Sequence, residues 1–329
     1  MNNTLLAPLP WQQKQWQHLY QLHQANRLPH ALLFTGQSGL GKRLFAAHFA
    51  KTLLCKSALI AGSACQHCRD CLLVAANTHP DLSCVVPDKV GKGIKIEQIR
   101  NIIEQSNQTT QSAYKIIIID PAESLLVAAS NALLKNLEEP TDRTLFILIT
   151  GNPGLLLPTI RSRCQFIRFT TPQQSQGKDW VREQIPDFQS IDELYALADG
   201  APLQAVGYAE TGVFEIYKNL LTVLIQLVKK EIDPVKLAES YLKTELSTVL
   251  HCLIRLVSDI IKANFIMDAD TNGNSKSLRV LAKALDTSFL FNYFEQLIKY
   301  RQHAKIALNQ QLLLEDLFCC WYLRGKACT

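Results

Sequence analysis

The chain has 329 residues, of which 47% are hydrophobic and 19% charged, and its net charge is +5. This length and composition predict a globular protein of two or three domains with sizeable cores. They argue against a membrane protein, because charged residues interrupt every apolar run well before the roughly 18 residues that a membrane span requires. The mild charge also means that any contact with nucleic acid would need a local basic patch. Residues 1–4 lack the basic start of a signal peptide, so we expect a cytoplasmic protein.

The N-terminal region predicts a phosphate-binding loop of the P-loop type. Residues 11–25 have the pattern of a lead-in helix, residues 31–34 form a short apolar run typical of a buried strand, and residues 44–50 have helical spacing. Between that strand and the second helix the chain has the spacing G-x-x-x-x-G-K. Glycines there allow successive backbone N–H groups to point at a phosphate, and the lysine reaches the terminal phosphates. The residues concerned are Gly36, Gly39, Gly41 and Lys42.

The residue after the lysine departs from the P-loop pattern. A serine or threonine hydroxyl should follow Lys42 to bind Mg²⁺, but the chain has Arg43. The strand before and the helix after still predict a P-loop fold. The alternative for function is a glycine turn that only joins strand to helix, with Lys42 in solvent.

Four of the ten cysteines cluster after the P-loop helix and predict a zinc site. Two overlapping C-x-x-C steps bring three thiolates together, and a cysteine at the end of the helix can complete a tetrahedron. A site closed by four protein ligands has a structural role. The alternatives are buried or redox cysteines, or substitution of one ligand by His67 or His79. The predicted ligands are Cys55, Cys65, Cys68 and Cys71.

A second part of a nucleotide site follows. Residues 81–87 alternate as in a strand, and a helix is predicted from residue 96 to 104. Residues 114–120 then form an apolar run that ends in Asp120, as in a parallel strand covered on both faces. In P-loop proteins such an aspartate belongs to the Mg²⁺ shell. The glutamate that would activate water is replaced by Pro121, and Glu123 is only a weak candidate to stand in for it.

Further motifs carry a family resemblance. The run N-A-L-L-K-x-L-E-E-P lies at 131–140, a buried strand is predicted at 144–150, and R-S-R-C lies at 161–164. Together with the P-loop and the cysteine insertion, these motifs resemble the bacterial clamp-loader branch of the AAA+ ATPases. The resemblance implies an α/β plus all-α protein, with a P-loop parallel sheet and zinc insertion, a small helical lid and a C-terminal helical collar. The expected domains are 1–169 with the zinc module at 55–71, then 170–210, then 211–329.

The same resemblance predicts that this chain does not hydrolyse ATP. Motor subunits of the branch have Lys-Thr or Lys-Ser in the P-loop, Asp-Glu after the acidic strand and an arginine in the lid. Here the corresponding residues are Arg43, Pro121 and Leu203. The Ser162-Arg163-Cys164 motif is intact, which implies that Arg163 is an arginine finger for a neighbouring subunit, while ATP binding at the degenerate P-loop is weak or absent.

The implied partners are the gamma/tau and delta subunits of a hetero-pentamer, with the sliding clamp and primer-template DNA reached through the complex. Residues 170–177 are expected to form a linker, 178–209 the three-helix lid, and 213–323 a helical region with a loop at 270–277. Its apolar stripes predict mainly a core, with some surface for a neighbour. One alternative is a working gamma/tau-type ATPase. Another is an independent DNA-binding zinc protein, for which Lys56 and Arg69 are too few basic residues.

Overall fold

The computed structural model describes residues 8–57, 63–89, 91–106, 112–265, 275–303 and 309–323. The chain divides into two compact units, Met1–Asp179 with Ala201–Gln204, and Trp180–Gly200 with Ala205–Thr329. The finer division into domains at 1–169, 170–210 and 211–329 stays a prediction. Most of the predicted loop at 270–277 lies outside the described residues.

The first unit is built on a five-stranded parallel sheet with the strand order β2-β3-β4-β1-β5. Strands β1, β3 and β4 are buried along their whole length, as expected for apolar runs covered on both faces. The predicted α/β class and parallel sheet are confirmed. The strands are β1 (Ala31–Thr35), β2 (Leu82–Val85), β3 (Lys115–Ile119), β4 (Thr144–Thr150) and β5 (Gln165–Arg168).

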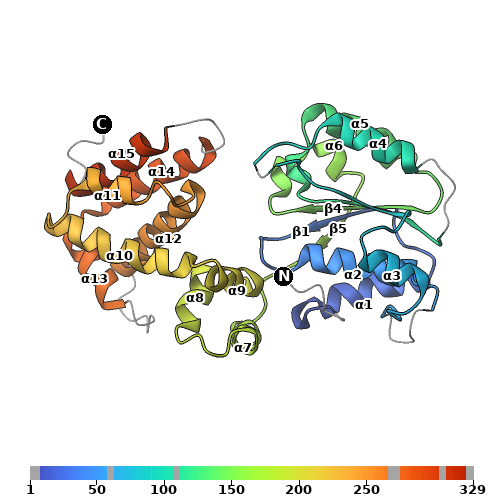
Figure 1. The fold of residues 1–329 in the computed structure, drawn as a ribbon, viewed down its shortest axis with the longest axis horizontal. Helices are drawn as coiled ribbons and strands as arrows, with labels where there is room; N and C mark the ends of the chain where they lie inside the picture. The colour runs from blue at the N-terminus through green and yellow to red at the C-terminus, as the bar shows by residue number, and fades with distance from the viewer. Residues whose placement is uncertain are drawn as a thin grey trace. The chain divides into compact units, whose positions relative to one another are not determined.

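Successive side chains of the buried strands β1 and β3 enter two different cores. In β1, Leu32 and Phe34 join one cluster, whereas Leu33 joins the other. In β3, Ile116 belongs to the first cluster and Ile117 to the second. Figure 1 shows the corresponding layers, with α1 and α2 on one face of the sheet and α4 and α5 on the other. The alternation fixes the register of the sheet, because a slip by one residue would exchange the two cores.

Helices of the first unit connect these strands, and the described ones include short segments that the sequence did not predict. Helix α3 lies within the cysteine region, although only a loop was expected there. The unit contains η1 (Pro10–Gln12), α1 (Gln13–Gln24), α2 (Lys42–Leu54), α3 (Arg69–Ala75), α4 (Ile96–Ser106), η2 (Ala122–Ser124), α5 (Val127–Glu138), η3 (Pro153–Leu155) and α6 (Pro158–Arg161).

One expectation was wrong at the end of this unit. Residues 170–177 were expected to form a linker because they are polar, but helix α7 (Gln174–Gln184) begins inside this segment. Polarity alone does not oppose a helix, since glutamine is a good helix former. Pro172 lies just before α7, where the ring does not remove a hydrogen bond from the helix interior.

The second unit is helical throughout its described residues, as predicted. Its core holds Trp321 and Tyr293, both almost fully buried, with ring centroids 5.2 Å apart. No single described helix is long and apolar enough to span a membrane, although α9 and α10 meet that criterion as a bent pair. Its helices are α8 (Ile191–Leu197), α9 (Pro202–Glu210), α10 (Val213–Lys229), α11 (Pro234–Ser240), α12 (Leu246–Phe265), α13 (Ser275–Ala284), α14 (Thr287–His303) and α15 (Gln310–Leu323), although the first residues of α9, up to Gln204, belong to the first unit.

Candidate nucleotide and metal sites

The glycine-rich loop that the sequence predicts to be a P-loop lies between β1 and α2. Gly39 has φ +77° and Gly41 has φ +83°, a left-handed conformation that strains other residues. A Cβ atom at Gly39 would lie 2.4 Å from the Cβ of Gln204, and one at Gly41 would lie 2.5 Å from Cδ1 of Leu9. The glycines are therefore needed here for close approach of the protein's own groups.

Lys42 is turned onto the loop that precedes it. Its Nζ donates hydrogen bonds to the carbonyl oxygens of Gly36 and Gln37, at 2.5 and 2.7 Å. Burial lowers the pKa of Lys42, while the negative charges of Asp120 and Glu123 act to raise it. At least two of the three ammonium donors are thus used by the loop itself.

Arg43 and Asp120 form an ion pair at the same site. The Nε of Arg43 lies 3.7 Å from Oδ2 of Asp120. Burial raises the pKa of Asp120, and the positive charges of Arg43 and Lys42 act to lower it. The Arg43 guanidinium thus supplies positive charge to the carboxylate that is expected to face Mg²⁺ in a working P-loop site.

The protein's own chain also covers the loop. Trp11 and Gln12 donate side-chain hydrogen bonds to the carbonyl oxygen of Leu40, at 3.1 and 2.8 Å. The N–H of Leu203 donates to the carbonyl oxygen of Gly39 at 3.1 Å. Leu203 thus lies beside the loop, and its assignment to the position of a lid arginine stays a prediction. The roles of Trp11 and Gln12 were missed, because they depend on contacts between residues far apart in the chain.

Glu123 acts electrostatically on this site, although it was a weak candidate in the sequence. Burial lowers the pKa of Lys42 and raises that of Asp120, and the negative charge of Glu123 opposes the first change and adds to the second. One of its oxygens, Oε1, accepts a hydrogen bond from the N–H of Gly151 at 3.0 Å. That contact constrains the side chain, and Pro121 stays at the position where a general base is expected.

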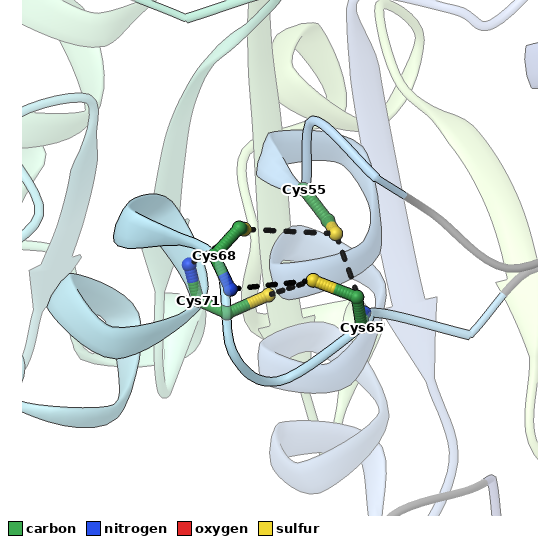
Figure 2. A group of neighbouring side chains, drawn as sticks. All are labelled: Cys55, Cys65, Cys68 and Cys71. Carbon is green, nitrogen blue, oxygen red and sulfur yellow. Dashed lines mark hydrogen bonds between the residues drawn. The ribbon is translucent and has the colours of Figure 1, made fainter.

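The four predicted cysteines come together around one point, as Figure 2 shows. Cys55 caps the C-terminus of α2, Cys68 caps the N-terminus of α3, and Cys71 lies in the first turn of α3. All four sulfur atoms lie within 4.8 Å of one another. The N–H groups of Cys65, Cys68 and Cys71 each donate to the sulfur of another member of the group, at 3.3–3.4 Å.

The geometry of the four sulfur atoms fits a metal ion. Zinc bound to thiolates at about 2.3 Å in a tetrahedron would place the sulfur atoms roughly 3.8 Å apart. The pair Cys55 and Cys68 is 3.9 Å apart, and the pair Cys65 and Cys71 is 4.0 Å apart. Desolvation raises the pKa of Cys65, but N–H donors of Cys68 and His67 outweigh it and bring the pKa to about 6. The residues present can therefore hold a metal ion.

The two histidines considered as substitute ligands have other partners. His67 is exposed, and its Nδ1 lies 2.7 Å from the carbonyl oxygen of Cys65. His79 is buried, and its Nε2 lies 3.5 Å from Oδ1 of Asp70. Neither is part of the group of four cysteines that could hold an ion.

Arg163 lies near the amino-terminal ends of the parallel strands, whereas the P-loop follows their carboxyl-terminal ends. The P-loop follows the last residue of β1, Thr35, which pairs with Arg168 at the end of β5. Arg163 precedes the start of β5, where Gln165 pairs with Leu32. Since β1 and β5 are parallel, the length of about four strand residues, or roughly 13 Å, separates these two ends of the strands. The guanidinium pairs with Glu138 and donates to the carbonyl oxygen of Thr159 at 2.9 Å.

Comparison with known proteins covers both units. The family model described as "DNA polymerase III, delta subunit" matches residues 11–173, and "DNA polymerase III, delta subunit, C terminal" matches residues 212–322. A DNA polymerase III subunit delta' from Pseudomonas aeruginosa is 34% identical over 320 residues, covering 95% of this chain and 96% of that protein. This chain belongs to the delta-prime family. The delta-prime subunit of Escherichia coli is 29% identical over 315 residues, covering 94% of this chain and 93% of that protein.

For this delta-prime family member, the sequence resemblance to the clamp-loader branch is thus confirmed at the level of the family. Among solved structures, a DNA polymerase III gamma subunit-related protein from Thermotoga maritima aligns with 94% of this chain and 99% of its own, with a TM-score of 0.46 and 20% identity. A likeness at that level supports no inference about chemistry. The roles of individual residues at the two sites stay predictions.

Proposed function

We propose that this chain is a non-hydrolysing subunit of a clamp loader in DNA replication. The observation that carries the proposal is the set of contacts at the P-loop. Lys42 binds the carbonyl oxygens of its own loop, and Arg43 is paired with Asp120. Charges that would bind the terminal phosphates and Mg²⁺ are therefore engaged within the protein, so ATP binding is weak or absent and hydrolysis does not occur.

The second part of the proposal assigns Arg163 as an arginine finger that acts on a neighbouring subunit. Its place at the edge of the sheet away from the P-loop supports this role, because the guanidinium is remote from its own phosphate-binding loop. The ion pair with Glu138 does not oppose it. Glu138 is 49% exposed and the Arg163 side chain 33% exposed, and such pairs contribute only about 0–1 kcal/mol, so a phosphate can displace the carboxylate.

The metal in this proposal is one structural Zn²⁺ held by the four cysteines. Four thiolates leave no open coordination position, so the ion would stabilise the fold and not take part in catalysis. The proposed partners are gamma/tau-type motor subunits and a delta subunit in a hetero-pentamer, which loads the sliding clamp onto primer-template DNA. We also propose a cytoplasmic location.

The test is replacement of Arg163 by alanine in a loader reconstituted with candidate motor and delta subunits. Arg163→Ala should leave assembly intact but reduce DNA-stimulated ATP hydrolysis at the adjacent site, since a finger supplied in trans is worth roughly 10³–10⁵ in rate. Arg100→Ala removes an exposed arginine from α4 and is the control. If the Arg163→Ala loader hydrolyses ATP and loads clamps like the wild type, the finger assignment is wrong.

A further inference from the structure

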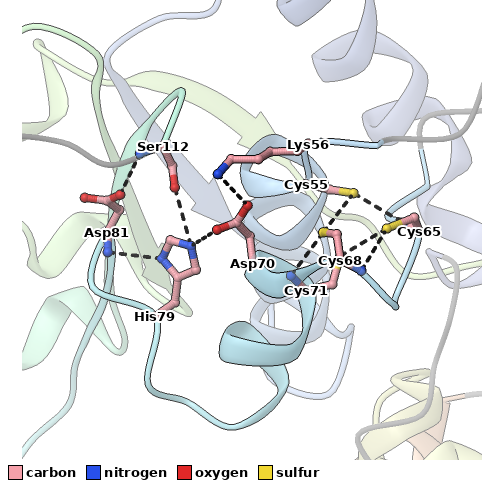
Figure 3. A network of polar contacts seen from close by, with 9 residues as sticks. All are labelled: Cys55, Lys56, Cys65, Cys68, Asp70, Cys71, His79, Asp81 and Ser112. Atoms are coloured by element: carbon pink, nitrogen blue, oxygen red, sulfur yellow. Dashed lines mark hydrogen bonds and ion pairs between the residues drawn. The ribbon is translucent and has the colours of Figure 1, made fainter.

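A buried polar network joins the cysteine module to the sheet. Asp70, His79 and Asp81 are only 6%, 5% and 3% exposed. Figure 3 shows that they form a continuous path from α3, through the loop before β2, to Ser112 ahead of β3. Ionisable side chains are rarely this buried unless they are paired, so their contacts should carry a structural role.

The hydrogen bonds define the tautomer of the neutral His79 ring. The N–H of Asp81 donates to Nδ1 of His79 at 3.1 Å. Because a backbone N–H can only donate, Nδ1 is an acceptor and the ring proton of the neutral imidazole is on Nε2. That nitrogen lies 3.5 Å from Oδ1 of Asp70 and 3.5 Å from Oγ of Ser112. The ring therefore directs its single proton toward these two oxygen atoms.

At one end, the network lies beside the cysteine group. Asp70 directly precedes Cys71, and its Oδ2 lies 3.5 Å from Nζ of Lys56, the residue after Cys55. Oδ2 is buried and accepts no hydrogen bond from the described residues, so the Asp70 carboxylate depends on these two contacts at 3.5 Å, with Lys56 on the Cys55 side and His79 on the sheet side. Movement of α3 would break both contacts and leave a buried charge without a partner, which is costly.

At the other end, the network enters the pairing of β2 with β3. Oδ2 of Asp81 accepts a hydrogen bond from the N–H of Ser112 at 2.9 Å. The carbonyl oxygen of Asp81 accepts one from the N–H of Ile116 at 2.8 Å. In the strand order, β2 is the last strand at its side of the sheet and pairs only with β3. A strand that is paired on one side only has fewer hydrogen bonds to hold it, so the contacts of Asp81 should add to the stability of β2.

We propose that Asp70 and His79 are positioning residues that fix the metal-binding cysteines to this side of the sheet, so that metal retention and the stability of β2 are coupled. The inference rests on the proposed metal site. Partners outside the ligand shell orient metal ligands, and their loss typically costs 10–100-fold in metal affinity. Here the effect would act through the helix that carries Cys71, without contact between His79 and the metal.

The experiment uses the full zinc-loaded chain and measures two quantities. The first is the rate of zinc release to a chelating dye, and the second is amide hydrogen exchange of β2. Asp70→Asn and His79→Ala should each release zinc at least about ten times faster than the wild type. The effect of the double variant should be smaller than the product of the two single effects, because both changes break the contact that Asp70 and His79 share. Exchange in β2 should rise in both single variants.

Matched controls separate this effect from a general loss of charge or of a histidine. Asp88→Asn removes the same charge from an exposed ion pair with Lys95, and His18→Ala removes an exposed histidine from α1. Both should keep wild-type release rates. Wild-type release rates in Asp70→Asn, or additive effects in the double variant, would overturn the inference. Asparagine has nearly the same shape as aspartate, so Asp70→Asn tests the inference even if His79→Ala does not fold.

The zinc content of the wild-type chain is measured first. A wild-type chain that binds no zinc would overturn the proposed metal site and the metal part of this inference. Exchange of β2 would then still decide whether Asp70 and His79 attach α3 to the sheet, because unchanged exchange in both variants would overturn that part too. The two failures are therefore distinguishable.

Discussion

Arg43 stands beside Asp120 at a position where motor subunits of the clamp-loader branch have a serine or threonine. The guanidinium cannot bind Mg²⁺, and its charge is already paired with the carboxylate. Lys42 next to it is occupied by carbonyl oxygens. Arg43 thus changes the electrostatics of the loop, while the glycine backbone and Lys42 are kept.

We expect no appreciable ATP hydrolysis by the purified chain, because the hydroxyl ligand of Mg²⁺ and the water-activating glutamate are both absent. Restoring them with Arg43→Thr and Pro121→Glu should not be sufficient, since Leu203 lies where the lid arginine would be. The measurement is phosphate release, with a gamma-type motor subunit as positive control. Turnover by the wild-type chain at a motor-like rate would instead identify a working ATPase.

His251 on α12 should make the second unit sensitive to acid. Its Nε2 lies 2.9 Å from the hydroxyl of Tyr208, and burial lowers its pKa, while the charge of Asp199 acts to raise it. The unfolded chain, with a histidine pKa of about 6.5, therefore takes up a proton more readily than the folded one. This contribution to stability is complete above pH 6.5 and is lost as the pH falls through the lowered pKa.

The check is the free energy of unfolding of the wild type and of His251→Gln at pH 7 and pH 5.5. The wild type should lose more stability on acidification than the variant, by at most about 1.4 kcal/mol for each pH unit in the window. His18→Ala, which removes an exposed histidine, is the control. An equal loss in wild type and His251→Gln would show that His251 does not titrate as expected.

For single residues, the sequence predicts metal ligands better than it predicts contacts between residues far apart in the chain. The four cysteines follow from local spacing, and the structure brings them together. The contacts of His79 with Asp70, and of Gln12 with Leu40, could not be found in the same way. They join residues that no local pattern relates, and they depend on how separate elements pack.

Among the elements, the cysteine module between α2 and β2 is the one whose stability would depend most on the proposed zinc ion. Residues 63–68 have no regular secondary structure, and α3 is only seven residues long, too short to be stable alone. A tetrahedral metal would connect the end of α2 to this short helix.

We therefore predict one tightly bound Zn²⁺ per chain, and its loss in Cys68→Ser. The variant should also melt at a lower temperature, because three thiolates leave a coordination position that water must fill. Cys84→Ser changes a cysteine of β2 outside the group and should retain the metal. Metal analysis and thermal melting of both variants are the measurements, and a fully folded native chain without metal would contradict the assignment.

The sequence predicted most long elements but not the short ones. Buried strands such as β1, β3 and β4 are uninterrupted apolar runs, and the long helices α10 and α12 have clear apolar stripes. In β5 only one residue of four is buried, so it lacks such a run and pairs through its backbone. Helix α3 is hidden among cysteines, whose spacing was read as a loop.

For the whole molecule, the division into two units has a thermodynamic consequence. The chain on either side of α8 is tied to the long helices, because Phe188 packs on Phe214 with ring centroids 5.2 Å apart and Arg255 pairs with Asp199. Helix α9 is tied to α12 through the hydroxyl of Tyr208, which lies 2.9 Å from Nε2 of His251. Helices α8 and α9 should therefore unfold together with α10 and α12. The sheet and the cysteine module belong to the other unit.

Calorimetry of the full chain should accordingly show two unfolding transitions. A zinc chelator should lower the temperature of one of them, that of the unit with the sheet, and should leave the other unchanged. Acidification from pH 7 to 5.5 should destabilise the helical unit less in His251→Gln than in the wild type, which identifies its transition. One joint transition, or an equal shift of both by the chelator, would contradict this division.

The parallel sheet gives the molecule a direction. Under the proposed function, the end of the sheet that carries Arg163 can complete a catalytic centre on the next subunit. An arginine supplied by a neighbour to the P-loop end would not lead to ATP hydrolysis. Two copies of this chain placed side by side would form a junction at which no ATP is hydrolysed. A second copy would thus add an inactive junction to the ring. One copy is enough to set the end of the ring at which the series of ATP-hydrolysing subunits begins.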